Sequence, residues 1–284
     1  MDIRKMLVVI GLVAAGAASG CEKKPEGGGG GGGALPGAAG AKEAGKEAAP
    51  AAVGGDVLDA AKVQNPATIS GTVTVSGTVS PPGTVDMGQK PECVATHGGQ
   101  PVFKDNLIVG PKQELKDCFV YIKKGLEKYK FNPPATPAVI DQKGCMYSPH
   151  VFGIQVNQDL EIRNSDPFQH NINVKENNPF NEAMVKGQPP VTRPKWFKKE
   201  GVPTAFQCDV HAWMHAYACV LKHPYWAVTP IDGKFSITGL PPGKYTVSVW
   251  HEVLPSLKPP AQADVEIEVK EGETKTQDFT YSMK

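Results

Sequence analysis

The sequence lacks a charge excess, a second long apolar run and clear helical periodicity. Its 30 Lys and Arg residues nearly balance 29 Asp and Glu residues, for a net charge of +1. Proteins that bind nucleic acid usually carry a basic excess, so nothing here points to nucleic acid. Beyond the first 21 residues no stretch is apolar and long enough to cross a bilayer. The stretch 66–284 is long enough for one large domain or two small ones.

Two familiar metal motifs are also missing. His251-Glu252 lacks the second histidine of a zinc-protease helix. His97 is separated from Cys93 by three residues, so the pattern of c-type haem attachment is absent. We expect His150, His223 and His251 to be structural or to lie at an interface.

The first 21 residues predict export. Arg4 and Lys5 precede an apolar run, residues 6–18, that is too short to span a membrane and is typical of a signal peptide. The small residues that lead to Cys21 resemble the bacterial lipobox, in which the cysteine is acylated. Because Glu22 rather than Asp follows, we expect a lipid anchor on the periplasmic face of the outer membrane. The alternative is ordinary secretion with an incidental Cys21.

Residues 22–65 read as a tether. They are rich in Gly, Ala, Pro, Lys and Glu and include an unbroken glycine run, Gly27 to Gly33. Such a segment has too little apolar bulk to offset its ordering entropy, so we expect it to be disordered. Its typical reach would be roughly 30–40 Å.

Short β-branched and aromatic runs between plentiful Gly and Pro predict an all-β protein. Many of these runs alternate with period two, as residues of a half-buried sheet do. The runs are 69–75, 119–122, 152–156, 160–162, 170–174, 235–237, 245–250 and 265–269.

One short segment carries the chemistry of a metal site. Cys208, His211 and Met214 follow one another as Cys-x2-His-x2-Met at the end of a predicted strand. A thiolate suits Cu(I), an imidazole suits both oxidation states, and a weak thioether completes the mixture that copper needs. The segment therefore predicts one copper ion. His215 is an alternative to Met214 as a ligand.

A second imidazole should come from a different strand. In the strand 170–174, period-two alternation places His170 on the apolar face with Ile172 and Val174. A buried histidine is often only a hydrogen-bonded core residue. Paired with the Cys-His-Met segment, His170 is better read as the missing ligand.

These two segments, NSDPFQHNINV and CDVHAWM, resemble the copper-binding segments of cupredoxins, and the loop is similar in length to that of amicyanin. The resemblance extends over about 138–221. It implies a Greek-key copper domain, residues 131–222, with one type 1 copper ion held by His170, Cys208, His211 and Met214. It further implies that Asn171 ties the two segments together by hydrogen bonds.

The flanks, residues 66–130 and 223–284, resemble a carboxypeptidase-regulatory, transthyretin-like β-sandwich. The resemblance rests on the turns at 232–235 and 240–245. Since neither flank alone supplies enough strands for a core, we expect one sandwich with the copper domain inserted in it.

The six cysteines sort into three roles. Cys21 would take lipid and Cys208 copper, which leaves Cys93, Cys118, Cys145 and Cys219. An even remainder in an oxidising compartment suggests two disulfides among three possible pairings. We favour Cys93 with Cys145 and Cys118 with Cys219; the alternative is that some stay reduced.

We expect a carrier of single electrons rather than an enzyme, with a c-type cytochrome or a copper enzyme as its partner. The alternative is a non-redox protein that delivers copper or binds a ligand of the cell envelope. Lys195, Lys198 and Lys199 could steer an acidic partner. A solvated loop explains this cluster better.

Overall fold

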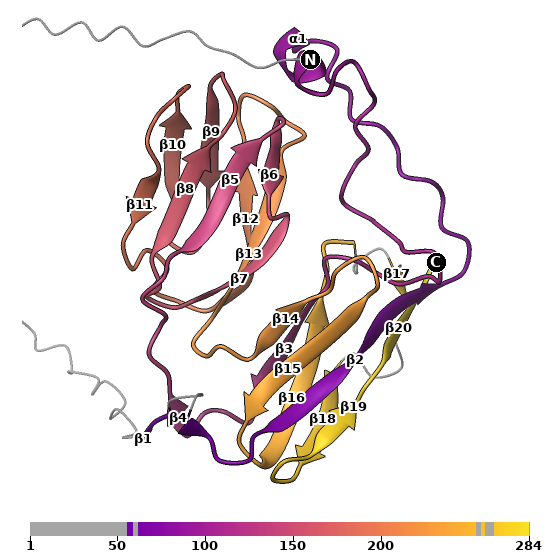
Figure 1. Cartoon of the computed structure of the whole chain (residues 1–284), viewed down its shortest axis with the longest axis vertical. Coiled ribbons are helices and arrows are strands. Elements are labelled where there is room, and N and C mark those ends of the chain that lie inside the picture. Colours follow the sequence, from indigo (N-terminus) through magenta and orange to yellow (C-terminus); the bar gives the residue numbers. More distant parts are fainter. Residues whose placement is uncertain (1–55, 59–61, 254–256, 259–263, 284) are drawn as a thin grey trace, which may run out of the picture. The chain divides into compact units, whose positions relative to one another are not determined.

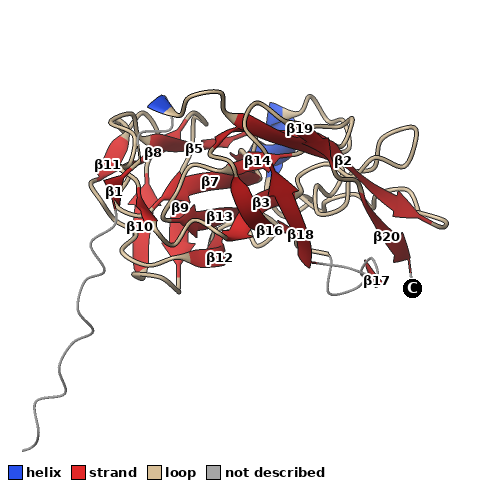
Figure 2. Ribbon diagram, turned by 90° about the horizontal axis from the view of Figure 1, so that it is seen from below, coloured by secondary structure: helices blue, strands red, loops and turns tan. Residues whose placement is uncertain are grey.

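The computed structural model describes residues 56–58, 62–253, 257–258 and 264–283. Strands dominate this part of the chain, which confirms the prediction of an all-β protein (Figure 2). Within it, α1 (Pro91–Thr96) is the one α-helix, and no helix there is long and apolar enough to span a membrane. The predicted signal peptide, Cys21 and residues 22–55 of the predicted tether lie outside the described residues.

The described residues include 56–58 and 62–65, which precede Pro66, where the tether was predicted to end. The strand β1 (Asp56–Val57) pairs in parallel with β4 (Tyr129–Lys130). The backbone oxygen of Asn65 accepts a hydrogen bond from the amide of Gly272. Backbone hydrogen bonds thus hold described residues at the C-terminal end of the predicted tether.

Two sheets form the region that contains the predicted copper segments (Figure 1). The five-stranded sheet has the order β10 (Phe180–Met184), β9 (His170–Val174), β12 (Gly201–Gln207), β13 (His215–Leu221), β7 (Val151–Gln155). The four-stranded sheet has the order β11 (Val191–Arg193), β8 (Leu160–Asn164), β5 (Ala138–Lys143), β6 (Met146–Ser148). We call these two sheets the ligand-bearing sheets.

Alternation along the strands fills the space between these two sheets with apolar side chains. Ile162 of β8 and Ile172 of β9 are fully buried there, and so is Phe206 of β12. Cys208 and Met214 belong to the same cluster of buried residues. The candidate ligands thus extend an apolar core at the end of the strands.

Strands from before and after this region pair in two further sheets, the flanking sheets (Figure 1). One has the order β14 (Trp226–Val228), β3 (Phe119–Lys124), β16 (Gly243–Trp250), β18 (Asp264–Val269). The other has the order β15 (Lys234–Leu240), β2 (Ala67–Ser76), β20 (Phe279–Met283), β17 (Leu257–Lys258), with β19 (Thr274–Thr276) beside β2.

The turn between β14 and β15 shows why its sequence is Asp-Gly-Lys. Gly233 has φ +64, and a Cβ there would lie 2.5 Å from the backbone oxygen of Val73. Only glycine adopts this conformation so close to another chain segment without strain. The Asp232 carboxylate accepts a hydrogen bond from the Lys234 amide and closes the turn.

The segment between β2 and β3, residues 77–118, carries α1. Two backbone hydrogen bonds, from Val85 to Val102 and from Lys104 to Gly83, join its two arms. A disulfide links Cys93 of α1 to Cys145, in the turn between β5 and β6. This disulfide confirms the first predicted pairing.

The second predicted pairing is wrong, since Cys118 and Cys219 are free and buried. Cys118 packs in the core of the flanking sheets. Its neighbour Phe119 instead joins a separate cluster with Cys219. Adjacent residues of a strand point to opposite faces, so the two sulfur atoms face different cores.

Apolar and polar contacts join the ligand-bearing sheets to the flanking sheets, within one compact unit, residues 52–284. The apolar cluster holds Val151, Cys219 and Leu221 of the former and Phe119 of the latter. Beside it, His150 lies between two carboxylates: its Nδ1 is 3.2 Å from Asp105 and its Nε2 is 2.6 Å from Glu252.

Candidate metal centre

The pairing of β9 with β12 brings the two predicted copper segments together. The strands are antiparallel, with Phe206 opposite Val174 and Gln207 opposite Asn173. The first residue of β9, His170, therefore lies beside the loop that follows β12, residues 208–214. A strand pairing thus joins residues that are about forty positions apart in sequence.

Three donor atoms converge at this place. The Nδ1 atoms of His170 and His211 are 2.9 Å apart, and the sulfur of Cys208 is 3.7 Å from Nδ1 of His211. Donor atoms of the three residues all lie within 4.8 Å of one another. Each of the three side chains is at most 1 % exposed.

Met214 closes the same loop. Its side chain is fully buried, and its backbone oxygen accepts a hydrogen bond from the Cys208 amide at 3.2 Å. Its own amide donates to the backbone oxygen of His211 at 2.9 Å. These two bonds fold the loop into a tight turn, which places a thioether and a thiol on one short segment.

Asn171 joins the two segments. Its side-chain oxygen accepts hydrogen bonds from the amides of Asp209, at 2.7 Å, and Val210, at 3.3 Å. The same oxygen lies 3.3 Å from the sulfur of Cys208. The Asp209 carboxylate in turn accepts hydrogen bonds from Asn171, Asn173 and Asn181. The ligand loop is thereby fixed to β9 and β10.

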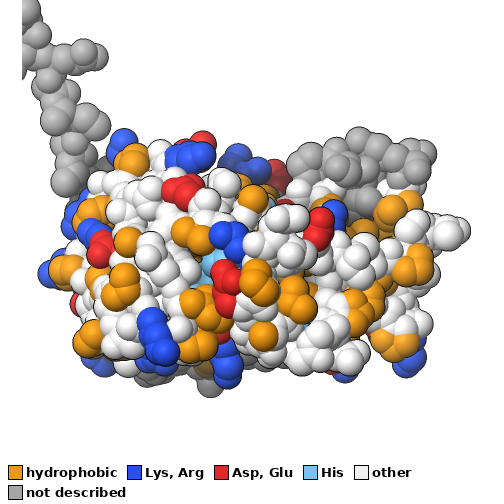
Figure 3. Space-filling model, turned by 90° about the horizontal axis from the view of Figure 1, so that it is seen from above, with side chains coloured by type: hydrophobic (Ala, Val, Ile, Leu, Met, Phe, Trp, Pro, Cys, Tyr) orange, Lys and Arg blue, Asp and Glu red, His pale blue; other side chains and the backbone are white. Residues whose placement is uncertain are grey.

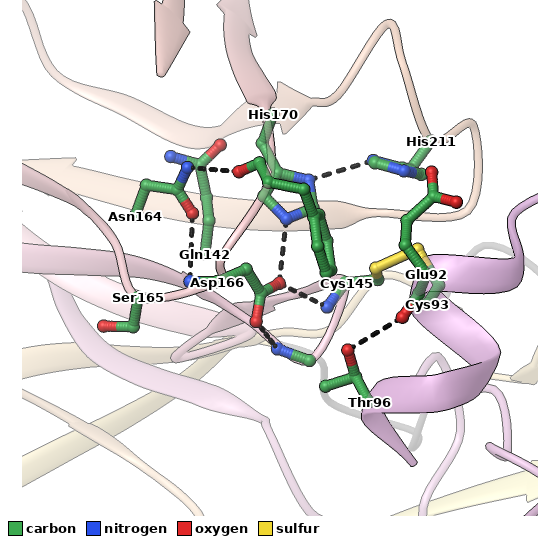
Figure 4. Close-up of polar contacts among 12 residues, drawn as sticks. Glu92, Cys93, Thr96, Gln142, Cys145, Asn164, Ser165, Asp166, His170 and His211 are labelled. Atoms are coloured by element: carbon green, nitrogen blue, oxygen red, sulfur yellow. Dashed lines mark hydrogen bonds and ion pairs between the residues drawn. A yellow bond between two sulfur atoms is a disulfide. The ribbon is translucent and has the colours of Figure 1, made fainter. Parts of the chain in front are cut away.

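Asp166 is a residue of the site that sequence reasoning missed (Figure 4). Its Oδ2 atom lies 2.8 Å from Nε2 of His170, whereas His211 contacts the other ring nitrogen, Nδ1. Amides of the turn between β5 and β6 also donate to this carboxylate, Gly144 at 2.7 Å and Cys145 at 2.8 Å. The signal in the sequence was a carboxylate four residues before the histidine, which becomes informative only once the turn is known.

The surroundings favour different protonation states at the three donors. Burial acts to raise the pKa of Cys208, but hydrogen bonds from His170 and nearby amides outweigh it, so this pKa is lowered. For His170, burial acts to lower the pKa, but Asp166 and Cys208 raise it. Burial, the nearby His170 and Lys90 lower the pKa of His211 to about 4. A thiolate and a neutral imidazole are the forms that bind metals.

The Cys93–Cys145 disulfide and α1 lie beside His211 (Figure 4). Donor atoms of Cys93, Cys145 and His211 lie within 4.8 Å of one another. The ring of Trp213 lies 5.3 Å from that of His211, and its indole N–H donates to the backbone oxygen of Cys145. Among the described residues, Nε2 of His211 has no hydrogen-bond partner although it is buried.

The donor set fits copper. One thiol and two imidazoles converge, and a buried thioether follows on the same loop. This mixture of soft sulfur and imidazole is the one that copper electron-transfer sites use. The fit rests on the identity of the donors and on their convergence.

The other histidines lie outside this cluster. His215 is exposed at the start of β13. His223 accepts a hydrogen bond from the Tyr225 amide, and His251 accepts one from the Val253 amide. His97 bonds the backbone oxygen of Gly144 through Nε2. These contacts give each buried histidine a structural partner.

Two of the predicted steering lysines contact the segment 157–159. Lys198 donates to the side chain of Asn157, and the amide of Lys195 donates to Asp159. On the face drawn in Figure 3, the described side chains of both charge signs are mixed with apolar ones. That face carries no patch of one sign that would by itself select a partner.

Comparisons with known proteins match parts of the chain. Residues 200–277 match the family described as polysaccharide lyase family 4, domain II. No curated protein matches. Solved structures similar to the chain include the Cu-containing nitrite reductase (NirK) of Thermus scotoductus SA-01, with 22% identity and a TM-score of 0.28, covering 33% of this chain and 26% of that one. The chain thus spans about a quarter of that reductase.

Two similar structures are small copper proteins. A purple cupredoxin from Nitrosopumilus maritimus is 23% identical, with a TM-score of 0.25, and the match covers 29% of this chain and 98% of that one. Amicyanin from Paracoccus versutus is 19% identical, with a TM-score of 0.26, and the match covers 36% of this chain and 96% of that one. The resemblance of the flanks to carboxypeptidase-regulatory modules stays a prediction.

Proposed function

We propose that the protein is a type 1 copper protein that carries single electrons. The observation that carries the proposal is the convergence of Nδ1 of His170, Nδ1 of His211 and the sulfur of Cys208 in a buried site. When bound, copper supplies one-electron chemistry between Cu(I) and Cu(II). His170, Cys208 and His211 would hold it, with Met214 as a weak fourth ligand.

The surroundings of the donors suit a carrier. Asn171 fixes the ligand loop to β9, and the Cys93–Cys145 disulfide fixes α1 next to His211. Ligands held in this way move little when the charge of the site changes, which favours fast electron transfer. The ring centroid of Phe168 lies 5.2 Å from that of His170, and the ring centroid of Trp213 lies 5.3 Å from that of His211. Both aromatic side chains are partly exposed, so they connect the site to the surface.

A visible spectrum tests the proposal. Cu(II) added to the purified full chain should give an intense thiolate-to-copper band. Cys208→Ser should lose the band, and Cys219→Ser, which alters a buried free cysteine outside the site, should keep it. A wild-type protein without the band, or a Cys208→Ser variant that retains it, would refute the proposal. Ordinary Cu(II) signals without colour would instead favour a non-redox copper-delivery protein.

We further propose that the protein is anchored by lipid on Cys21 and exchanges electrons with a redox protein such as a c-type cytochrome or a copper enzyme. The proposal rests on the small residues before Cys21 and on the apolar run that precedes them. Cys21→Ser should move the protein from the membrane fraction to the soluble fraction. If that variant stays in the membrane fraction to the same extent as wild type, lipid on Cys21 is not the anchor.

A further inference from the structure

The Asp166 carboxylate is buried and fully engaged. The residue is 4 % exposed and lies in the turn between β8 and β9. One oxygen accepts the amide of Gly144, and the other accepts the amide of Cys145 and contacts Nε2 of His170 (Figure 4). A carboxylate bound by two backbone amides stays charged and keeps one orientation.

The turn itself is held in place. The Asp166 amide donates to the side-chain oxygen of Asn164 at 3.1 Å. The Asn164 side chain donates to the backbone oxygens of Phe168 and Met184, each at 2.9 Å. The carboxylate therefore reaches His170 from a rigid support rather than from a free loop.

We propose that Asp166 is the positioning residue that orients His170 and lowers the reduction potential of the site. This inference rests on the copper function proposed above. The carboxylate accepts the Nε2 proton of His170, so Nδ1, which lies 2.9 Å from Nδ1 of His211, is the nitrogen left to bind the metal once it has lost its own proton. An anion hydrogen-bonded to a ligand imidazole makes that imidazole more basic and stabilises the higher charge of Cu(II).

The two imidazoles differ in this respect. Nε2 of His170 contacts a buried carboxylate, whereas Nε2 of His211 has no partner among the described residues. Among the described residues, a carboxylate is thus hydrogen-bonded to one of the two imidazoles and not to the other. A purely structural role for Asp166, as a cap for the turn at Gly144 and Cys145, would leave the metal unaffected.

The reduction potential of the copper-loaded full chain separates these roles. Asp166→Asn removes the charge at nearly constant shape. We expect Cu(II) binding to weaken about tenfold relative to Cu(I) binding, which raises the potential by about 59 mV for one electron. Asp141→Asn is the matched control, because Asp141 bonds Ser165 of the same turn. Its potential should stay close to that of wild type.

Equal potentials for Asp166→Asn and Asp141→Asn would overturn the inference, even if Asp166→Asn were less stable to urea. A wild-type chain that binds no copper would instead refute the proposed function. A second measurement needs no variant. In the Cu(I) form, nitrogen-15 NMR should show the His170 ring protonated at Nε2, with a slowly exchanging proton. A ring protonated at Nδ1 would contradict the inference.

Discussion

The flanking sheets bury the free cysteine Cys118, and the ligand-bearing sheets bury the free cysteines Cys208 and Cys219. The surroundings of Cys118 and Cys208 differ. Cys118 lies in the apolar core of the flanking sheets, where burial raises its pKa despite the Thr229 hydroxyl nearby. Cys208 is also fully buried, yet hydrogen bonds from His170 and adjacent amides lower its pKa. Burial alone suppresses a thiolate, whereas burial among donors favours one.

The buried polar groups of the flanking sheets and of the ligand-bearing sheets also differ in their hydrogen-bond partners. In the flanking sheets, Thr229 donates to the backbone oxygen of Leu115, and Tyr245 donates to that of Pro241. These two hydroxyls are satisfied by the backbone, whereas the buried hydroxyl of Tyr281 has no partner among the described residues. In the ligand-bearing sheets, titratable side chains contact one another, and His211 keeps a buried nitrogen without a partner among the described residues. Such clusters mark functional sites more often than structural ones.

The largest expected effect concerns His211, in the ligand loop, and His215, which directly follows that loop. His211→Ala should weaken Cu(II) binding by more than the roughly 10–100-fold that is typical of an outer-shell residue. His215→Ala is the control, since His215 is exposed outside the cluster. Calorimetric titration with Cu(II) measures both. If His215→Ala lost the metal and His211→Ala kept it, the ligand assignment would be wrong.

A second prediction concerns His150, where the two regions meet. Burial acts to lower its pKa, but Asp105 and Glu252 raise it to about 10, with Tyr217 bonded to the same Glu252. Since an unfolded histidine titrates near 6.5, this stabilisation is fully present below about pH 6.5. It is lost as the pH rises through about 10.

His150→Gln should therefore lower the free energy of unfolding in urea at pH 6 by about 3–5 kcal/mol. The same variant should differ less from wild type at pH 10.5. His215→Gln, at an exposed position, serves as the control. A deficit for His150→Gln that is equal at both pH values would show that the charge of the ring does not matter.

The third prediction compares loss of the Cys93–Cys145 disulfide with loss of the free thiols of Cys118 and Cys219. Cys93→Ala with Cys145→Ala opens a link between residues 52 positions apart and should cost about 2–4 kcal/mol of unfolding free energy. It should also let small anions reach the copper past His211, beside which the disulfide and α1 lie. Cys118→Ala with Cys219→Ala removes no link and should remain as resistant to small anions as wild type. Equal anion access in both double variants would argue against α1 as a cover.

The smallest effect concerns the close packing between the two regions. A Cβ on Gly153 of β7 would lie 2.1 Å from Nε1 of Trp226 in β14. Gly153→Ala should therefore cost about 1–3 kcal/mol in urea unfolding. Gly83→Ala, whose Cβ would meet only Lys104 at 3.9 Å, is the control. Trp226→Ala in the Gly153→Ala background should relieve the clash, and if it does not, this contact is absent in solution.

The local features of the fold and of the site could be predicted from the sequence. Period-two alternation predicted the strands, because a half-buried sheet residue must alternate. The Cys-x2-His-x2-Met spacing placed three donors on one loop, and alternation put His170 on the buried face. The structure brings His170, Cys208 and His211 together. Local periodicity and spacing were enough for the strands and for the donors on the loop, whereas the approach of His170 to that loop depends on the pairing of β9 with β12.

The remaining features depend on tertiary contacts that could not be predicted from the sequence. The predicted disulfide between Cys118 and Cys219 is wrong because a shift of one position along a strand moves a side chain to the opposite face of the sheet. Cys118 and Cys219 therefore lie in different cores. Asp166 gained a role only when the turn at Gly144 and Cys145 folded against it. The pairing of His150 with Asp105 and Glu252 joins three distant segments. Such contacts follow from tertiary structure rather than from periodicity.

The most direct test is a crystal structure of the copper-loaded full chain with anomalous data at the copper edge. We predict one strong anomalous peak, bonded to Nδ1 of His170, Nδ1 of His211 and the sulfur of Cys208. A peak elsewhere in the chain, or none in crystals grown with copper, would contradict the central claim.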